Sequence, residues 1–591
     1  MDNQNKNLIL ATVLSFVVIT VWFFLFPPEE QSPAVAEELA TEQLADPSAP
    51  ATGTAATTTV AISEPVQDAP RVPVETPELT GSISLLGGRI DDISLLNYNI
   101  DMGSDEIVHL LNPVGGDRDG YYAAFGWSPN AGVDTAGVPG PDTLWSLESG
   151  ETLTPDSPIT LVWDNGAGLT FRNTYSVDDK FMMTIDQTVT NASGTTATIT
   201  PYGVLRRFTE PDDLKGFFVL HEGLVRMSDS ALQELSYKDI RNEETADRIE
   251  VLESGWIGYT DHYWLTTIIP DQSQPFTSVS RLQPGEVYEA DAFMPSQTLA
   301  DGTDATVSTR FFVGAKEWET LREYENEQGV TGFINAIDWG WFFFLTKPIF
   351  WLLHNINAVI GNMGWSIVAL TVVLKALVLP LAYKSYVSMA KMKELQPQME
   401  KLKEEAGDDR AKLQQGMMKL YRDNKVNPAS GCMPMLLQIP IFFSLYKVIF
   451  VTLELRHAPW IGWIRDLSAP DPSSILNLFG LLPYSTPEPG SLFFILSLGI
   501  LPIFLGVSMW LQQKLNPAPT DPSQKMIFAW MPWVFMFMLG SFASGLVLYW
   551  ITNNVITFIQ QYAIMRSHGH KPDVLGNITS AFNRNKAKAE E

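Results

Sequence analysis

The stretch "GWSIVALTVVLKALVLPLAYKS" (residues 364–385) decides which class of fold this chain adopts. Apolar side chains run from Trp365 to Ala382, and only two hydroxyl groups, one proline and Lys375 interrupt them. About 20 apolar residues in a helix cross the hydrocarbon core of a bilayer. We therefore predict that residues 363–383 span a membrane and that Lys375 lies far from either end of the span.

The surroundings of Lys375 point to water inside the membrane. The predicted core spans contain no Asp or Glu, so no counter-ion for Lys375 is visible in them. A lysine at the centre of a span costs about 2.5–3.5 kcal/mol. To reach the cytoplasmic surface, its ammonium would have to cover the distance to Lys384, roughly 13 Å of helix. We favour a water-filled cavity that faces Lys375, with snorkelling to the surface as the alternative.

Other polar residues in the apolar stretches favour the same cavity. Thr371 lies one turn before Lys375 on the same helix face. Gln438 stands between two prolines, and Asn553 belongs to a group of amides in the last span. Such side chains also join helices to one another in membranes, so each alone is weak support. Together with Lys375 they predict a polar groove.

The apolar stretches predict a multi-domain protein with a polytopic α-helical membrane core and six spans in total. Residues 7–26 are interpreted as an uncleaved anchor, because the stretch is longer than the core of a secretory signal peptide. Cleavage after "AVA" (34–36) is the alternative. The predicted spans after 363–383 are about 431–451, 491–511, 526–542 and 544–565.

Charge sets the orientation of these spans. The chain carries −28 overall, but residues 27–332 carry −34 and the remainder carries +6. The loop 384–428 is rich in Lys and Arg, which places it in the cytoplasm. The acidic part then lies outside and both termini lie inside. Residues 331–362 are predicted to form an amphipathic helix in the outer membrane interface, and residues 567–591 a cytoplasmic tail.

The acidic part is predicted to fold as an antiparallel β-sandwich over residues 80–330. Apolar and polar residues alternate there between turn signals such as "DNG" and "NASG", a pattern typical of short strands. A helix is expected near residues 315–329. Residues 27–79 are rich in Pro, Ala, Thr and Glu, which predicts a disordered linker. The acidic charge argues against direct nucleic-acid binding.

The cytoplasmic loop 384–428 is predicted to be a helical hairpin. Apolar side chains recur at three- and four-residue spacing on one stripe, which breaks at "AGDD" (406–409) and then resumes. The methionines of this stripe are Met389, Met392, Met399 and Met417. Either one arm of the hairpin packs on the other, or the stripe contacts varied apolar partners, which flexible thioethers suit.

Residues for covalent or metal chemistry are missing from the predicted spans. Ser366 lies on the opposite helix face from Lys375, so no serine nucleophile stands beside the lysine. No P-loop pattern is present, and His568 and His570 are too few for a metal site. We therefore expect a protein that is not an enzyme and that uses no cofactor and no metal.

Several longer motifs together resemble a known family. They are "MDNQNKNLIL" (1–10), "MGWSIVALTVVLKALVLPL" (363–381), "NPASGCMPMLLQIPIFFSLY" (427–446), "DLSAPDP" (466–472) and "SGLVLYWITNNVITFIQQ" (544–561). These motifs cover the N-terminal anchor and the membrane core. They are similar to those of the YidC-type bacterial membrane protein insertases of the Oxa/Alb superfamily, in the Gram-negative form with a large periplasmic domain.

The resemblance implies a periplasmic β-supersandwich and five core helices around a hydrophilic groove that is closed to the periplasm. The cation of that groove is most often arginine in this family. Lys375 keeps the charge but loses bidentate recognition of carboxylates. Trp550 stands where a second tyrosine is common, so a hydroxyl is lost. The expected groove residues are Lys375, Thr371, Gln438, Phe442, Tyr549, Trp550 and Asn553.

The function that the resemblance implies is the insertion and folding of nascent inner-membrane proteins, alone or with the Sec translocon. The lipid bilayer, the ribosome and the signal-recognition receptor are the other expected partners. The protein is expected in the bacterial inner membrane as a multi-pass protein, with a cytoplasmic N-terminus and a periplasmic large domain. The alternative function is a small-anion channel or transporter that uses the same lysine and needs a path to the outside.

Overall fold

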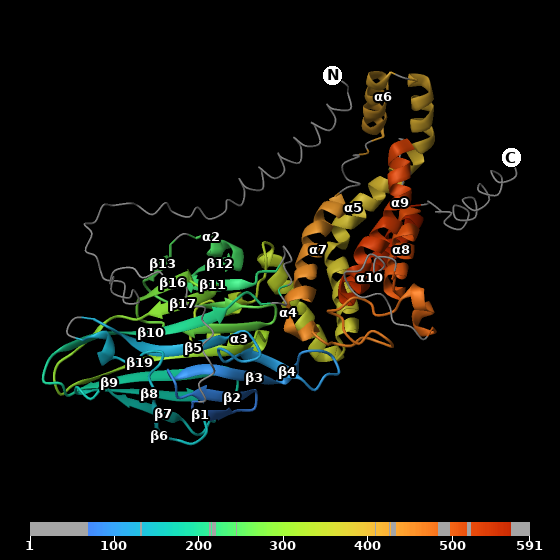
Figure 1. Ribbon diagram of the computed structural model, residues 1–591. Coiled ribbons are helices and arrows are strands. Elements are labelled where there is room, and N and C mark those ends of the chain that lie inside the picture. Colours follow the sequence, from blue (N-terminus) through green and yellow to red (C-terminus); the bar gives the residue numbers. More distant parts are fainter. Residues whose placement is uncertain are drawn as a thin grey trace. The chain divides into compact units, whose positions relative to one another are not determined.

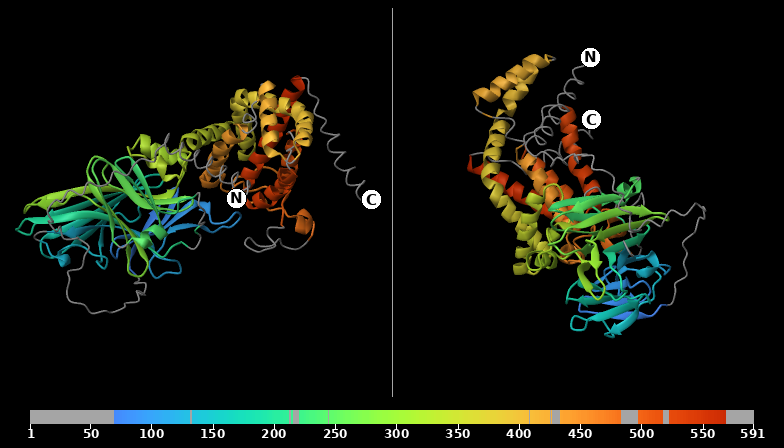
Figure 2. Two further views of the ribbon diagram at one scale, coloured as in Figure 1. Left: turned by 90° about the horizontal axis from the view of Figure 1, so that it is seen from above. Right: turned by 90° about the vertical axis from the view of Figure 1, so that its left-hand side faces the viewer.

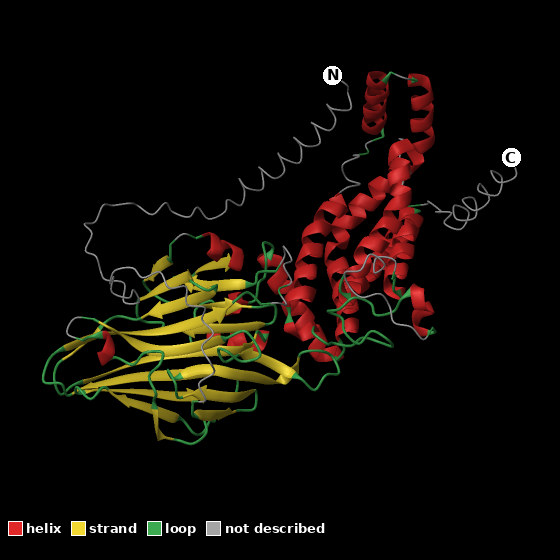
Figure 3. Cartoon of the chain, viewed as in Figure 1, coloured by secondary structure: helices red, strands yellow, loops and turns green. Residues whose placement is uncertain are grey.

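The computed structural model describes residues 69–568, apart from 131–132, 212–213, 215–219, 244, 408, 425, 427–432, 483–496 and 517–521. The predicted anchor 1–26, the linker as far as residue 68 and the tail from residue 569 lie outside the described residues. Strands dominate residues 71–315, and helices dominate from residue 318 onward (Figure 1, Figure 3). An antiparallel β-domain followed by a helical region is the order that the sequence predicts.

The first layer of the β-domain is an antiparallel sheet with the strand order β1-β2-β3-β5-β10-β17-β16-β13, in which β4 pairs with β3 and β18 with β10. Its ten strands among the described residues are β1 Arg71–Glu75, β2 Leu79–Ser84, β3 Arg89–Asn99, β4 Ile107–Leu111, β5 Tyr121–Pro129, β10 Ala197–Phe208, β13 Asp247–Val251, β16 Phe276–Gln283, β17 Val287–Phe293 and β18 Gln297–Leu299. This ten-stranded sheet can be followed in Figure 1 and, from two further sides, in Figure 2.

The second layer is an antiparallel sheet with the order β12-β11-β14-β15-β19-β9-β8-β7-β6. Its nine strands among the described residues are β6 Ser146–Ser149, β7 Ile159–Asp164, β8 Leu169–Val177, β9 Met182–Asn191, β11 Gly223–Ser228, β12 Ala231–Ser236, β14 Gly255–Thr260, β15 Trp264–Ile269 and β19 Asp304–Ala315. The ring of Phe125 lies 5.9 Å from that of Phe311 between the layers. The Gln187 amide also crosses them, donating to the carbonyl of Gly126 at 2.8 Å.

Alternation of side chains explains why these segments are strands. In β8, the side chains of Leu169, Phe171, Asn173, Tyr175 and Val177 are buried, and the residues that alternate with them are half exposed. Successive side chains of a strand point to opposite faces, so one face of β8 joins the core and the other meets solvent. The predicted antiparallel sandwich is therefore confirmed.

The start of the β-domain differs from the prediction. Residues 27–79 are predicted to be a linker, but β1 already occupies Arg71–Glu75 and pairs with β2. Val72 and Val74 are fully buried in the core. Two alternating valines on an edge strand are too short a signal to separate from the Pro-rich stretch before them, which is why the linker is predicted to end too late.

Short helices connect the strands and close the domain. They are η1 Thr135–Gly137, α2 Tyr237–Asn242, α3 Trp318–Asn326 and η2 Phe333–Ala336. The helix predicted near residues 315–329 is confirmed as α3, which buries Trp318, Leu321 and Tyr324. The ring of Trp318 lies 5.4 Å from that of Phe350, so α3 also packs on the first long helix of the helical region.

The long helices of the second region are α4 Phe343–Ile360, α5 Met363–Ala406, α6 Arg410–Asp423, α7 Met433–Val451, α8 Ile500–Gln513, α9 Pro522–Met538 and α10 Ser544–Ser567, with the short turns η4 Leu453–Leu455, η5 Ile475–Gly480 and η7 Leu539–Ser541. Within the described residues, α4 and α5 are long and apolar enough to cross a membrane. Segments of α7, α8 and α9 are apolar but shorter. The six predicted spans therefore stay a prediction.

Helix α4 has one buried face and one exposed apolar face. Ile349, Phe350 and Leu353 are buried, whereas Trp341, just before the helix, is 94% exposed and Val359 is 87% exposed. Exposed aromatic and aliphatic side chains on one helix face suit the boundary of a bilayer. The length and composition of α4 also meet the criterion for a span, so its predicted place in the interface stays a prediction.

The predicted cytoplasmic hairpin is formed by the end of α5 and by α6. α5 stops at Gly407, whose φ of +52° only glycine adopts without strain. Asp409 begins α6 by accepting a hydrogen bond from the backbone of Lys412 at 3.0 Å. The Tyr421 hydroxyl of α6 lies 3.8 Å from the sulfur of Met399 on α5. The two arms therefore pack on each other.

The methionine stripe takes part in this packing. The half-buried members of the stripe are Met389, Met392, Met399 and Met417. Leu395 between them is buried, and the side chain of Leu402 covers Gly416 on the other arm. Packing of arm on arm, the first of the two explanations of the stripe, thus accounts for Met399 and Leu402, whereas Met389 packs in a cluster that includes Ile564 of α10.

The first turn of α5 is held by close packing on the segment between α7 and α8. Asn362 caps the helix by accepting a hydrogen bond from the backbone of Trp365 at 3.1 Å, and its amide donates to the carbonyl of Trp460 at 3.2 Å. A Cβ on Gly364 would lie 2.2 Å from the Trp460 ring. Only glycine lets the indole approach the helix at this point.

We predict that Gly364→Val lowers the midpoint of thermal unfolding of the purified protein. The added side chain overlaps the indole of Trp460, and overpacking of this kind costs about 1–3 kcal/mol or more. Leu377→Val, which introduces the same residue at an exposed position of α5, serves as the control for β-branching. An unchanged midpoint for Gly364→Val would contradict the packing described.

Candidate functional site

Lys375 lies at one end of a chain of hydrogen bonds that reaches two other helices. Its Nζ on α5 donates a hydrogen bond to Oε1 of Gln438 on α7 at 3.2 Å. The Nε2 of Gln438 in turn donates to the hydroxyl oxygen of Tyr549 on α10 at 2.6 Å. The three residues form a continuous chain across three helices. We call Lys375, Gln438 and Tyr549 the polar chain.

The packing of α10 explains why these residues meet. Its first turn is fixed by hydrogen bonds from the backbone N–H groups of Ser544 and Gly545 to the carbonyls of Ala469 and Leu467, at 2.7 and 2.9 Å. These carbonyls belong to the "DLSAPDP" segment. α10 then runs beside α5 and also contacts α7. Shortly after this anchored start, Tyr549 is buried and faces Gln438.

An aromatic pair adjoins the polar chain. Phe442 lies one turn after Gln438 on α7, and Trp550 follows Tyr549 on α10. Their rings meet edge to face with centroids 4.6 Å apart, an arrangement that aromatic pairs prefer. Phe535 of α9 lies 6.1 Å from Trp550. The site therefore has a cationic end at Lys375 and an apolar flank.

Two of the predicted groove residues are placed differently from the others. The Thr371 hydroxyl donates to the carbonyl of Ile367 in its own helix at 2.7 Å, and its side chain is 1% exposed. Asn553 is also buried, and its Oδ1 has no hydrogen-bond partner among the described residues. Neither residue is hydrogen-bonded to Lys375 in the described part of the chain. The structure thus joins Lys375, Gln438 and Tyr549, and separately Phe442 and Trp550.

The charge of Lys375 is not neutralised by a carboxylate of the apolar helices. No Asp or Glu occurs in residues 363–383 or in α7, α8, α9 and α10. Gln438 offers only a neutral amide oxygen. An ammonium group has three N–H donors, and the polar chain uses one of them. The arrangement can therefore hold an anionic or strongly polar group that enters from outside the chain.

Other polar side chains of α10 join it to α8. The Asn554 amide donates to the hydroxyl of Ser508 at 3.0 Å, and the Gln561 amide donates to Oδ1 of Asn516, just after α8, at 3.1 Å. Hydrogen bonds between helices are a common way to hold apolar helices together. These amides are therefore structural, whereas the polar chain leaves a charge in need of a partner.

Sequence reasoning missed a second lysine in an apolar helix. Lys447 of α7 is buried, and its Nζ lies 2.5 Å from Oδ2 of Asp338, in the segment before α4. The same oxygen accepts the backbone N–H of His221 at 2.9 Å. Burial lowers the pKa of the His221 imidazole, which stays neutral at pH 7. One feature of the sequence could have predicted this ion pair. Asp338 is an acidic residue in the apolar segment that precedes the spans, and Lys447 is a basic residue in an apolar helix.

Comparisons with known proteins identify the relatives of the chain. The family model described as the YidC periplasmic domain matches residues 71–352, and the one described as a 60Kd inner membrane protein matches residues 355–571. The chain is 59% identical to a membrane protein insertase YidC of Ruegeria pomeroyi, over 100% of both chains. It is also 59% identical to the membrane protein insertase YidC of Roseobacter denitrificans, over 99% of both chains.

A crystal structure of an active YidC insertase is also similar. The match covers 84% of this chain and 93% of the other, with 17% sequence identity and a TM-score of 0.35. That TM-score is too low to support an argument about arrangement. Family membership therefore rests on the sequence relatives.

We predict that Lys447→Met destabilises the protein more than the double variant Asp338→Asn/Lys447→Met. Removing one partner of a buried ion pair leaves the other charge uncompensated, which costs about 3–5 kcal/mol. The double variant removes both charges of the pair, so neither charge is left unpaired. The amide introduced at position 338 still offers an acceptor oxygen to the backbone N–H of His221. Thermal unfolding of the purified protein measures both. A double variant that is no more stable than Lys447→Met alone would contradict a coupled pair.

Proposed function

Because the chain belongs to the YidC family of membrane protein insertases, we propose that it inserts nascent membrane proteins into the inner membrane through the polar chain around Lys375. The observation that carries the proposal is the ammonium group on α5, which donates to Gln438, itself bonded to Tyr549, and which pairs with no carboxylate of the apolar helices. Insertion is not enzyme catalysis, and the site has the features of a binding surface.

The mechanism that we propose is capture of charge followed by sliding. A short hydrophilic tail of the substrate, often acidic, enters the groove and binds the free donors of Lys375. The apolar segment behind it then moves along Phe442 and Trp550 into lipid. Transfer of apolar surface out of water, at roughly 25 cal/mol per Å², drives this exit. The membrane potential adds about 2.3 kcal/mol per charge per 100 mV when an anion moves outward.

Lysine shapes what the groove recognises. An ammonium group is a compact point charge without the planar fork of arginine. It therefore attracts a carboxylate without fixing its orientation, which suits tails of varied sequence. Gln438 holds the ammonium in place through one hydrogen bond, so the charge is already positioned before a tail binds.

The proposed topology has six membrane spans, as the sequence predicts. Six spans place both termini and the hairpin of α5 and α6 in the cytoplasm, and the β-domain in the periplasm. The positive charge of the hairpin loop supports this orientation. The Sec translocon, the ribosome and the signal-recognition receptor are proposed as partners that deliver or receive substrates. The exposed apolar face of α4 lies along the outer bilayer surface in this arrangement.

We predict that the charge at position 375 matters more than the residue type. Lys375→Arg should insert a single-span substrate with an acidic periplasmic tail as wild type does. Lys375→Glu should fail with that substrate, because like charges repel strongly in a medium less polar than water. Lys375→Met should translocate an acidic tail several-fold less than a neutral tail. Protease protection of the tail in inverted vesicles measures each outcome.

The control for this series is Lys384→Met, which removes an exposed lysine of the same helix and should leave both tails unaffected. If Lys375→Met translocates both tails as well as wild type, snorkelling explains the lysine and the capture step is wrong. Ion flux through vesicles that contain the purified protein distinguishes the channel alternative. A steady anion current that Lys375→Met abolishes would favour the channel.

We also predict that the apolar contact inside the hairpin is needed for insertion. Met399→Ser combined with Met417→Ser should reduce insertion several-fold, because both methionines are half buried and Met399 contacts Tyr421 of the other arm. Neutralising the exposed lysines of the same arms with Lys401→Gln and Lys412→Gln should reduce it less. Equal loss in the two variants, at matched protein levels in the membrane, would indicate that surface charge is the important property.

A further inference from the structure

A cavity of about 70 Å³ lies on the outer face of the ten-stranded sheet. Gly203 and Leu205 of β10 face the core, since a Cβ on Gly203 would touch Phe125 and Ile268. Because side chains of a strand alternate, Tyr202 and Arg206 point to the opposite face. The cavity is thus separate from the interior of the sandwich and from the helical region.

The register of two strands makes the floor of the cavity. Tyr202 stands opposite Gly126, and the next outward position of β10 stands opposite Ala124 of β5. A Cβ on Gly126 would lie 2.7 Å from the Tyr202 hydroxyl. Two small residues beside each other therefore leave a depression in a surface that larger side chains would fill.

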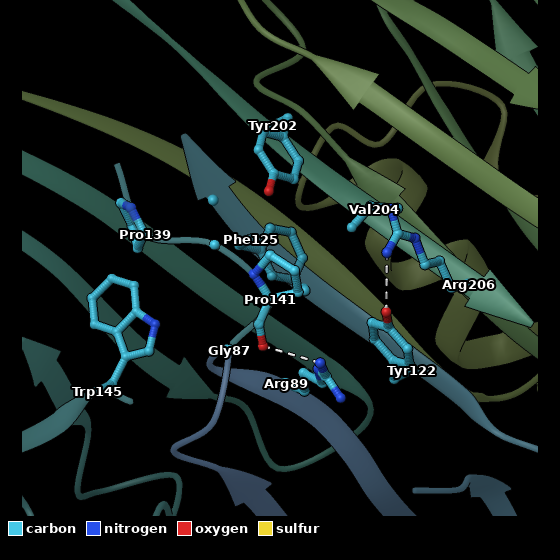
Figure 4. Close-up of a pocket in the computed structure, with 13 residues that line it drawn as sticks. Gly87, Arg89, Tyr122, Phe125, Pro139, Pro141, Trp145, Tyr202, Val204 and Arg206 are labelled. Atoms are coloured by element: carbon cyan, nitrogen blue, oxygen red, sulfur yellow. Dashed lines mark hydrogen bonds between the residues drawn. The ribbon is translucent and has the colours of Figure 1, made fainter. Parts of the chain in front are cut away.

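Side chains and a rigid loop form the walls. Figure 4 shows Tyr202, Arg206 and Tyr122 along the strands, with Arg89 below them and the loop of Pro139, Pro141 and Trp145 across from them. Two prolines restrict the backbone of this loop, so the cavity is preformed. At about 10–15 Å³ for each water molecule, it has room for about five waters or a small organic group.

Arg89 forms one edge of the cavity. Its Nη2 donates to the carbonyl of Pro141 at 3.0 Å, and its guanidinium lies 5.2 Å from the centre of the Tyr122 ring. Arg89 makes no ion pair with a carboxylate among the described residues. Its remaining donors, which a guanidinium holds in a planar fork, are free for an oxyanion.

Arg206 forms the other edge. Its Nη1 donates to the Tyr122 hydroxyl at 3.3 Å, so both guanidiniums flank the same tyrosine. Its Nε donates to Glu289 at 2.5 Å, and Arg281 pairs with that carboxylate as well. Arg281 also pairs with the neighbouring Asp291 at 3.1 Å, a carboxyl whose pKa burial raises above its usual range. The charge of Arg206 is therefore paired with a carboxylate, whereas Arg89 pairs with none among the described residues, so the positive charge left over at the cavity is that of Arg89.

This positive charge stands out against the domain that carries it. Residues 27–332 have a net charge of −34, yet no Asp or Glu is among the described residues that line the cavity. Solubility alone does not explain why two arginine side chains, Arg89 and Arg206, line the same open cavity. Paired guanidiniums with neighbouring hydroxyl groups are the usual surroundings of carboxylates and phosphates.

We propose that this cavity binds a small organic oxyanion, with its carboxylate or phosphate group between Arg89 and Arg206 and its hydroxylated body against Tyr202 and Trp145. The ligand makes no use of the polar chain, so this site is independent of the proposed insertion function. The β-domain then acts as a receptor for a small periplasmic solute.

Isothermal titration calorimetry of the full chain in lipid nanodiscs tests the proposal. The ligands are D-glycerate, inorganic phosphate and glycerol, and empty nanodiscs correct for binding to lipid. We expect glycerate or phosphate to bind and glycerol, which lacks the charge, not to bind. Whichever of the two anions binds more tightly identifies the oxyanion. No binding of either anion, or binding of glycerol equal to that of glycerate, would overturn the proposal.

Three variants locate the site. Arg89→Gln, which leaves the pairs of Arg206 intact, should weaken anion binding at least tenfold. Ala124→Leu should do the same by filling the floor without changing any charge. Arg172→Gln, at an exposed arginine that pairs with Glu148 outside the cavity, should bind as wild type does. Wild-type affinity in the first two variants, with unchanged circular dichroism, would show that the anion binds elsewhere and that the assignment is wrong.

Discussion

An ammonium group inside an apolar helix requires polar partners, and the packing of the helical region depends on this requirement at Lys375. The cost of a lysine in hydrocarbon exceeds what one ordinary hydrogen bond returns. Gln438 of α7 supplies the partner of the ammonium, and Tyr549 of α10 accepts a hydrogen bond from the same amide. α5, α7 and α10 must therefore keep one relative register at this depth. A shift of α7 along its axis would break the hydrogen bond between Gln438 and the Lys375 ammonium, and a shift of α10 would break the one between Gln438 and Tyr549.

The buried Lys447 and the half-buried Lys375 differ chiefly in how their charges are balanced, and this difference separates a structural lysine from a candidate functional one. Lys447 is paired with Asp338, so its charge is neutralised within the chain and the pair holds α7 against the segment before α4. Lys375 has a neutral amide instead. A charge without a balancing charge retains its attraction for an anion from outside. In the groove that we propose, this attraction is available to the tail of a substrate.

The β-domain shows the same contrast on a surface. Its average charge is strongly negative, yet Arg89 and Arg206 gather beside a depression that Gly126 and Ala124 leave open. Net charge describes how the domain behaves in solution and at long range. Recognition of a ligand depends on the few groups within hydrogen-bond reach. An acidic domain can therefore carry a site for an anion.

The sequence by itself determined that an antiparallel sandwich is followed by a region of apolar helices, because hydrophobic length and period are local properties of the chain. Apolar runs marked the helices, alternation marked the sandwich, and an isolated lysine in "LTVVLKALVLPL" marked the site. Only the tertiary structure decided that Gln438 joins Lys375 to Tyr549 while Thr371 bonds to its own helix, and that Lys447 has an acid partner. It alone also placed Arg89 beside Arg206, which lies far away in the sequence. Contacts between distant segments depend on strand register and helix packing, which no local pattern of residues encodes.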